Sequence, residues 1–220
     1  MLHFDEIYGI AAGRHGGEDT LETQITPPVP AEELLRLPED RWLSTLTKCV
    51  FQAGFNWKVI QAKWDGFESA FDGFDIGRCA MMDDEKFDAL LQDSSIVRNG
   101  TKIASVRDNA AFLLELRDDG GAGKVLGGWP SSDFVGLLDL LKKRGSRLGG
   151  STAQYAMRFA GRDSFILSRD VVARLIAEGI IDKPPASKKS MAAVQGAFNT
   201  WMDQSGRSLT EISRVLAMSI

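Results

Sequence analysis

The feature that most constrains this chain is a basic, glycine-rich turn between two helical patterns, at residues 140–161. The first helix ends in a run of cations, and Gly145 is expected to end it in the left-handed conformation. Residues 146–150 then form a tight turn, because paired glycines accept backbone angles that other residues resist. Ser151 or Thr152 is expected to cap the second helix. The sequence therefore predicts two helices joined by a short hairpin.

The hairpin has the chemistry of a phosphate site, because backbone N–H groups at a helix start lie beside a cationic cluster. No acidic residue occurs between Leu140 and Gly161. A solvated basic face on an ordinary helix pair is the alternative interpretation. The arrangement resembles the helix-hairpin-helix element with which base-excision DNA glycosylases hold duplex DNA. The DNA-binding residues predicted from it are Lys142, Lys143, Arg144, Arg147, Gly149, Gly150, Ser151 and Thr152.

The overall composition is that of a globular protein, with 44% hydrophobic and 25% charged residues among 220. The net charge of −4 argues against a protein that coats nucleic acid everywhere, although one basic face is compatible with it. The two cysteines, Cys49 and Cys79, suggest no disulfide framework and favour a cytoplasmic location. We found no signal peptide pattern and no membrane-spanning run, so no membrane partner is expected.

Metal ligands are scarce, since His3 and His15 are the only histidines beside the two cysteines. Their spacing matches no zinc site. We therefore expect no metal and no cofactor, and we expect the chain to act as a monomer.

The distribution of helical patterns predicts an all-α fold in two parts. Residues 1–38 hold several glycines and the run Pro27-Pro28-Val29-Pro30, which indicates a partly extended N-terminal arm. Residues 39–220 form the helical domain that carries the hairpin. Strand-like alternation is absent, whereas helix-capping residues recur along the domain at Asn56, Asp83, Asn99 or Thr101, and Ser168.

A family resemblance begins at the motif Gln52-Ala53-Gly54-Phe55-Asn56-Trp57. It is similar to the Gln-Ala-Gly-x-x-Trp motif of the bacterial 3-methyladenine DNA glycosylase I (Tag) family. The resemblance covers roughly Trp42 to Gly161, in the same order and at near-constant spacing. Further matches are Phe67, Phe71, Phe74-Asp75, Leu90 to Asp93, Ile96 to Asn99, Lys102-Ile103, Asn109-Ala110, Leu141 to Gly145, Gly150 to Thr152 and Tyr155-Ala156. It implies a helix-hairpin-helix DNA glycosylase-like fold.

The resemblance also implies an activity, the removal of alkylated purines and chiefly of 3-methyladenine from double-stranded DNA. The base is flipped into an aromatic pocket and its N-glycosidic bond is hydrolysed. A flipped cationic purine gains stacking from aromatic faces. Trp57 would be the stacking wall and Gln52 a polar neighbour, although a core tryptophan is the alternative for Trp57. The base pocket carried over from the family comprises Trp57, Gln52, Phe51, Cys49, Asn56 and Tyr8.

Several positions depart from the family pattern. Cys49 stands where a Glu that contacts the base is common, and Phe51 stands where a second Gln is usual. Ala11, Ala12 and Gly16 replace the family's pocket Tyr, zinc-ligand His and Trp. The zinc ligands are missing at both ends of the family's zinc clip, so the resemblance implies no zinc here.

The residues expected to act in catalysis follow the hairpin. In the wider superfamily an Asp at the next helix start stabilises the developing sugar cation; Ser168 aligns with it, and Asp170 lies two residues later. Helix capping by Ser168 and a favourable dipole contact of Asp170 are the alternative interpretation. A 3-methylated adenine is already cationic, so its release requires binding and electrostatic stabilisation rather than a strong acid.

Three other functions remain open from the sequence. The first is a relative that binds DNA lesions without releasing the base, which the substitutions at Cys49, Ala11 and Gly16 suggest. The second is a glycosylase for another modified base, which the more apolar pocket suggests. The third is an all-α interaction protein with no role on DNA.

Overall fold

The computed structural model describes all residues from 1 to 220 and contains helices but no β-strand, as the sequence predicts. Contacts divide the chain into two compact units. The terminal unit comprises residues 1–29, 130–136 and 161–220, and the central unit comprises residues 30–129 and 137–160. This division differs from the expected boundary at residue 38, because both ends of the chain fold together.

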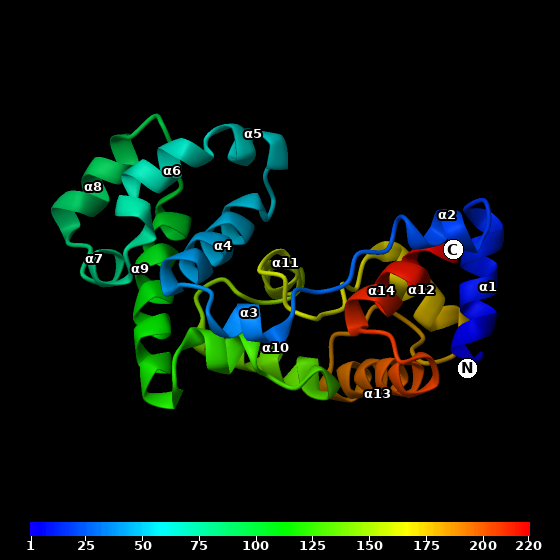
Figure 1. Cartoon of the computed structure of the whole chain (residues 1–220). Helices are drawn as coiled ribbons and strands as arrows, with labels where there is room; N and C mark the ends of the chain where they lie inside the picture. Colours follow the sequence, from blue (N-terminus) through cyan, green and yellow to red (C-terminus); the bar gives the residue numbers. More distant parts are fainter. The chain divides into compact units, whose positions relative to one another are not determined.

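The helices are named in chain order (Figure 1). They are α1 (Phe4–Arg14), α2 (Glu18–Glu22), α3 (Ala31–Leu35), α4 (Glu39–Gln52), α5 (Trp57–Ala62), α6 (Trp64–Ala70), α7 (Ile76–Ala80), α8 (Asp84–Gln92), α9 (Gly100–Glu115), α10 (Phe134–Arg144), α11 (Ser151–Phe159), α12 (Arg169–Ala177), α13 (Lys188–Ser205) and α14 (Leu209–Met218), with the short turns η1 (Asp72–Phe74), η2 (Leu116–Asp119), η3 (Gly123–Gly127) and η4 (Ser131–Asp133).

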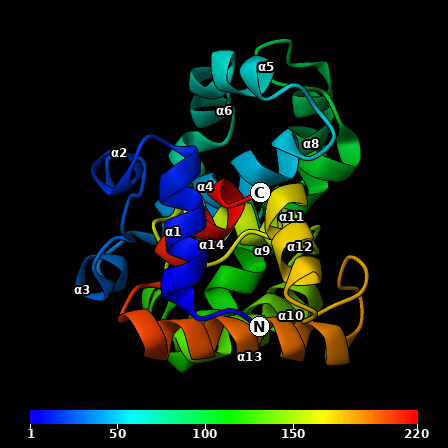
Figure 2. The ribbon, with the colours of Figure 1, turned by 90° about the vertical axis from the view of Figure 1, so that its right-hand side faces the viewer.

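The terminal unit is built around α14, which packs against α1, α12 and α13; Figure 2 shows α1 running in front of α14 and above α13. Its core is aromatic and fully buried. The ring of Phe165 lies edge-on to Phe134 at 5.0 Å and stacks on Phe198 at 4.5 Å, and Phe198 contacts Trp201 at 5.7 Å. Because Trp201 Nε1 also donates to Leu2 O at 3.3 Å, this core holds both ends of the chain.

The N-terminal segment folds differently from the partly extended arm that was expected. It contains α1, α2 and α3 within residues 1–38. A capping box begins α1, with the His3 side chain accepting from Asp5 N and the Glu6 carboxylate accepting from His3 N. Phe4 and Ile7 are buried one helical turn apart on its inner face. The glycines and prolines of this segment separate short helices rather than preventing them.

The central unit is organised by α4, which packs against α9 and α11 (Figure 1). Its inner face buries Trp42, Leu43, Leu46 and Val50. A second core lies under α6, where the rings of Trp64, Phe67, Phe71 and Phe74 stack with centroid separations of 5.1 to 6.3 Å. These contacts hold α6 against η1, which in turn packs against α4.

Local capping signals are confirmed for α5, α8 and α12, which begin after Asn56, Asp83 and Ser168. Asn56 accepts from Lys58 N at 2.9 Å, and Asp83 accepts from Lys86 N at 2.8 Å. Of the two candidates for α9, Asn99 is the N-cap.

The hairpin corrects two details of the sequence prediction. Gly145 does not have a positive φ; the positive φ angles in the turn are those of Arg147, at 61°, and Gly150, at 57°. Gly145 serves close packing instead, because a Cβ there would lie 2.6 Å from Leu148 Cδ1. The cap of α11 is Gly150, at φ 57° and ψ −134°, and not Ser151 or Thr152, which are helical.

Candidate functional site

The hairpin presents two cations without an ion-pair partner. Lys142 and Arg147 are both exposed. The other two cations predicted to bind DNA are neutralised, since Lys143 pairs with Asp139 at 2.6 Å and Arg144 pairs with Glu115 at 3.2 Å. A phosphate near the hairpin therefore meets Lys142 and Arg147 first.

The N-terminus of α11 is open. Gly150 offers no side chain to cap it, so the first N–H groups, at Ser151 and Thr152, have no side-chain acceptor. Such groups bind anions, and the helix dipole adds to the attraction. The helix start at which the sequence predicts a phosphate site is therefore not occupied by a side-chain cap.

The hairpin is fixed to α9 by one buried amide. The Nδ2 of Asn109 donates to Ser146 O at 3.1 Å, and its Oδ1 accepts from Ser146 N at 2.8 Å. Asn109 is fully buried, so this pair of hydrogen bonds sets the position of the turn.

A small cavity of about 170 Å³ lies where the C-terminus of α4 meets α11. It is lined by Cys49, Gln52, Ala53, Gly54, Trp57, Ser151, Thr152 and Tyr155. Gln52 is only 6% exposed, and its amide oxygen Oε1 has no hydrogen-bond partner. Buried polar atoms are nearly always paired, so this oxygen is an acceptor available to a ligand.

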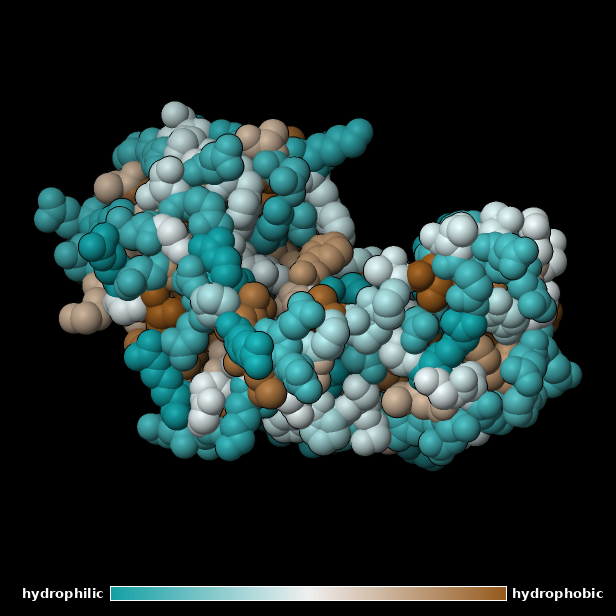
Figure 3. Space-filling model, in the orientation of Figure 1, coloured by the Kyte–Doolittle hydropathy of each residue, from teal (hydrophilic) through white to brown (hydrophobic).

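Trp57 stands at the edge of this cavity and is 42% exposed. Its ring lies edge-on to Tyr155 at 5.2 Å and to Phe159 at 5.8 Å. Figure 3 shows apolar atoms gathered between α5 and α11 on the face drawn, within a largely hydrophilic surface. An exposed tryptophan held by two aromatic edges is suited to stacking on a planar ligand.

The loop that carries Trp57 is held by a buried lysine. The Nζ of Lys102 donates to Phe51 O at 3.1 Å and to Ala53 O at 2.6 Å, and it lies 4.4 Å from the ring centroid of Phe55. Burial lowers the pKa of Lys102. The sequence alone assigns Lys102 no role, although the family resemblance at Lys102-Ile103 is the signal that marks it.

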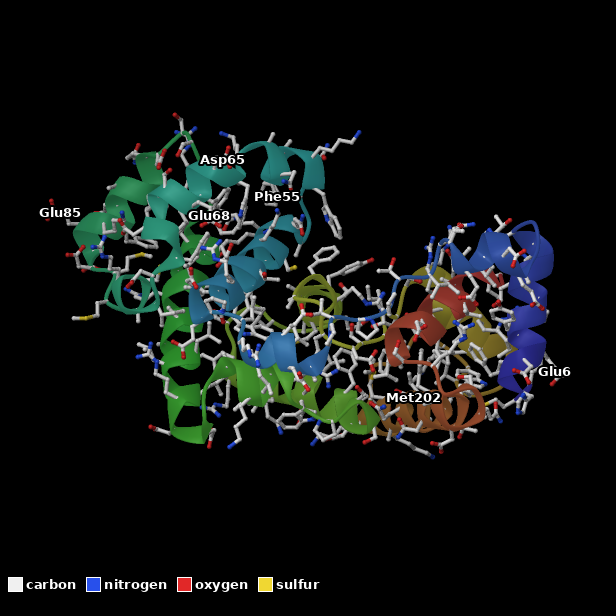
Figure 4. The ribbon with its side chains drawn as sticks, viewed as in Figure 1. Glu6, Phe55, Asp65, Glu68, Glu85 and Met202 are labelled. Carbon is white, nitrogen blue, oxygen red and sulfur yellow. The ribbon has the colours of Figure 1, made fainter.

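A larger cavity of about 530 Å³ shares Cys49 and Gln52 with the small one. It is lined by Arg41, Ser44, Thr45, Lys48, Cys49, Gln52, Gln61, Trp64, Glu68 and Phe159. Glu68, labelled in Figure 4, is its only carboxylate. Arg41 donates to both carboxylate oxygens, at 2.9 and 3.0 Å, and these hydrogen bonds keep the pKa of Glu68 below its usual value despite partial burial.

The predicted base-pocket residues of the central unit divide into two groups. Cys49, Gln52 and Trp57 line the small cavity, together with Ser151 and Thr152 of the hairpin. Phe51 is fully buried against Phe67, with ring centroids 4.6 Å apart, and it lines neither cavity. Asn56 caps α5 and also lies outside both linings.

Cys49 lies in the floor shared by the two cavities. Burial raises the pKa of its thiol to about 12, so the sulfur is a neutral thiol at ordinary pH. It therefore contributes apolar surface rather than charge.

The remaining predicted residues belong to the terminal unit. Tyr8 donates to Glu22 Oε1 at 2.7 Å, and this hydrogen bond raises the pKa of Tyr8 to about 12. Ser168 accepts from Val171 N at 3.3 Å as the N-cap of α12, and Asp170 pairs with Arg169 at 3.1 Å. The structure therefore does not bring these three residues into the unit that holds Trp57 and Gln52.

Two kinds of feature are absent from the structure. No helix has the length and apolar character needed to cross a membrane. No group of three or more His, Cys, Asp or Glu side chains is arranged to hold a metal ion.

Comparison with known proteins links these features to one family. Residues 38–126 match the sequence profile described as methyladenine glycosylase. DNA-3-methyladenine glycosylase 1 of Escherichia coli is 27% identical over 124 residues, which is 48% of this chain and 66% of that protein, so just under two thirds of the relative's length is spanned.

A solved structure extends the likeness to the fold. A single-residue variant of 3-methyladenine DNA glycosylase I, in complex with 3-methyladenine, superposes with a TM-score of 0.51 at 21% identity, covering 64% of this chain and 83% of that one. The enzyme of Staphylococcus aureus gives a TM-score of 0.49 at 22% identity, covering 56% and 76%. The segment 38–126, which carries α4, Gln52, Trp57 and Lys102, is therefore similar to the methyladenine glycosylase family.

Proposed function

We propose that the chain is a DNA glycosylase that removes alkylated purines, 3-methyladenine first among them, from double-stranded DNA. The match of residues 38–126 to the methyladenine glycosylase profile and the similarity to relatives named for this activity support the proposal. The product is an abasic site. The partner is duplex DNA with a damaged base, bound by one copy of the chain in the cytoplasm.

The observation that carries the proposal is the unpaired Oε1 of Gln52 in a cavity bordered by Trp57 and by the open N-terminus of α11. A flipped purine nucleotide provides a donor, a planar ring and a phosphate that match these three features. Its N–H edge donates to Gln52, Trp57 stacks on its ring as the base enters, and a neighbouring phosphate accepts from the N–H groups of α11.

Release of an alkylated purine does not require a strong general acid. In 3-methyladenine nucleotides the base already carries a positive charge, so breaking the C1′–N bond leaves both bonding electrons on the base and neutralises it. Water then adds to the sugar and loses a proton to solvent. The protein must hold the flipped nucleotide and stabilise the developing sugar cation. We keep Asp170 as the proposed stabilising carboxylate and Ser168 as its positioning cap.

Binding of DNA is proposed to depend on Lys142 and Arg147, the hairpin cations without ion pairs. Each phosphate contact releases counterions, so each contributes a slope of roughly −0.9 to log K against log salt. Replacing either residue by Ala should reduce the slope by about 1.

The test is release of free bases from methylated duplex DNA, separated by chromatography. We expect release of 3-methyladenine, slowed roughly 5- to 150-fold in Trp57→Ala because a base–aromatic stack contributes about 1–3 kcal/mol. Val59→Ala is the matched control, since Val59 is an exposed apolar residue of α5 outside both cavities. Equal release by wild type and Trp57→Ala would reject the stacking role.

A lesion-binding protein without excision is the second candidate. It is favoured by the engagement of Ser168 in a cap and of Asp170 with Arg169. Tight binding to duplex DNA with an abasic site, together with no base release, would select it over the glycosylase.

A further inference from the structure

The larger cavity, and not the small one, has the size of a ligand site. Small-molecule pockets span about 300–1,000 Å³, and this cavity, at about 530 Å³, lies within that range, whereas the cavity of about 170 Å³ beside Trp57 lies below it. Both cavities are lined by Cys49 and Gln52, so the larger cavity lies next to the small one beside Trp57.

One wall of the larger cavity is the ring of Trp64, which already holds a cation. The Nζ of Lys48 lies 4.9 Å from the ring centroid of Trp64 and has no carboxylate partner. Stacking on Phe67 and Phe74, at interplanar angles of 19° and 12°, keeps the ring of Trp64 in place. A preset aromatic face attracts a cation through its quadrupole, and lysine on its flexible stem can leave.

Two acceptors line the same cavity. Glu68 Oε1 is occupied by Arg41, Ser44 and Trp64, but Oε2 accepts only from Arg41 Nη2 and has a further lone pair to offer. Gln52 Oε1 has no partner at all. The positive charge of Arg41 offsets the negative charge of Glu68. A ligand cation that takes the place of the Lys48 ammonium on Trp64 therefore leaves the net charge of the cavity unchanged.

We propose that the larger cavity binds the cationic alkylated purine itself, with its ring on Trp64 in place of the Lys48 ammonium and its N–H groups donating to Glu68 and Gln52. This assignment rests on the proposed glycosylase function and adds the residues that select a charged base over a neutral one. The Lys48 ammonium occupies the ring face of Trp64 in the absence of such a base and is displaced when the base binds.

The test uses free nucleosides, so that it is independent of excision. The full chain is titrated by calorimetry with 7-methylguanosine, cationic at mildly acidic pH, and with neutral guanosine. Glu68 stays ionised there, because its pKa is lowered. We expect the cationic nucleoside to bind about tenfold more tightly, within the range of a desolvated cation–π contact.

Three variants separate the roles. Trp64→Leu should abolish the preference for the cationic nucleoside, and Glu68→Gln should reduce it about threefold. Lys48→Met should strengthen binding of 7-methylguanosine about threefold, because the competing ammonium is gone. A purely structural Lys48 would give no such gain. Glu85→Gln and Lys58→Met are controls, since Glu85 projects from α8 (Figure 4) and Lys58 is exposed on α5, both outside the cavity.

Equal or undetectable binding of both nucleosides up to millimolar concentration would overturn the assignment, as would an unchanged preference in Trp64→Leu or weaker binding in Lys48→Met. Base release from methylated DNA by the same preparations reports on the proposed function separately. Release without nucleoside preference would retain the glycosylase and reject this site. Preference without release would retain the site and reject the glycosylase.

Discussion

Two arginine–glutamate pairs, one chosen from each unit, differ in what surrounds them. In the terminal unit Arg174 and Glu178 have side chains only 10% and 5% exposed, and Ser219 and the N–H of Leu2 occupy their remaining hydrogen-bonding positions. In the central unit Arg41 and Glu68 are 39% and 28% exposed and line a cavity. The hydrogen-bonding positions of the terminal pair are occupied by protein groups, which makes it a closed pair. The central pair is open, because it lines a cavity that a ligand could enter.

Unpaired buried atoms follow the same division. The three buried side-chain atoms without a hydrogen bond, Trp42 Nε1, Thr47 Oγ1 and Gln52 Oε1, all belong to the central unit. Each unpaired buried polar atom lowers the stability of the fold. Such atoms are therefore expected mainly at functional sites. The terminal pair is therefore a structural pair, whereas the central cavities hold the residues proposed to recognise the base.

The largest expected effect is that of Arg174→Met, which leaves the buried Glu178 carboxylate without its cation. Breaking a buried pair costs about 3–5 kcal/mol. Arg41→Met, at the more exposed pair, should cost about 1 kcal/mol or less. Urea unfolding followed by circular dichroism measures both. Similar losses in the two variants would contradict the distinction between a closed and an open pair.

The second effect concerns the hairpin of the central unit. Gly150 has φ 57° and ψ −134°, a conformation nearly closed to a β-branched residue. Gly150→Val should cost about 1–3 kcal/mol of strain and weaken duplex DNA binding by roughly 5- to 150-fold. Fluorescence anisotropy measures the affinity.

Gly149→Ala is its matched control. A Cβ at Gly149 would have Lys142 Cγ as its nearest neighbour, at 3.9 Å, which is ordinary contact. DNA affinity should fall much less in this variant than in Gly150→Val, because Gly149, although among the predicted DNA-binding residues, does not have a positive φ. Equal DNA affinity of Gly150→Val and Gly149→Ala would show that the hairpin conformation does not contribute to DNA binding.

A smaller effect is expected for Lys102→Met. The variant loses two hydrogen bonds to the carbonyls of Phe51 and Ala53 but also removes a buried charge, so the net loss of stability should be about 1 kcal/mol. Amide exchange in the loop 53–56 should accelerate, while exchange of Ser146 N–H, held by Asn109, should not. Uniform acceleration at both places would mean that Lys102 stabilises the whole unit instead of the loop.

The smallest effect concerns Cys49. Burial raises the pKa of its thiol from 9 to about 12, so its contribution to stability is complete below pH 9 and is lost as pH rises from 9 towards 12. Cys49→Ala should therefore show a shallower loss of stability than wild type across this interval. At neutral pH iodoacetamide should leave the Cys49 thiol unmodified, which mass spectrometry detects. Rapid alkylation would show that the cavity floor opens.

The sequence was sufficient for most helix starts, although not for α11, which begins after Gly150. Asn56, Asp83 and Ser168 cap helices because each accepts from an N–H two or three residues onward. The helical fold class follows from the same local signals. The aromatic–glycine motif ending in Trp57 was also visible, because its residues are contiguous.

The sequence was insufficient where contacts join distant segments. Lys102 reaches the carbonyl of Phe51 across 51 positions, and Arg41 reaches Glu68 across 27. No periodicity encodes such pairs. The N-terminal helices escaped prediction for the same reason, since α1 is stabilised by α14 at the other end of the chain. The larger cavity and its Trp64 wall follow from these long-range contacts.

The most direct test of the account is the rate of 3-methyladenine release by Gln52→Leu under single-turnover conditions on methylated duplex DNA. Leucine removes the unpaired acceptor and keeps nearly the same volume. We expect stability equal to or above that of wild type, with release slowed roughly 5- to 150-fold by loss of a hydrogen bond of about 1–3 kcal/mol. Lower stability with an unchanged rate of release would contradict the account, because it would make Gln52 a structural residue.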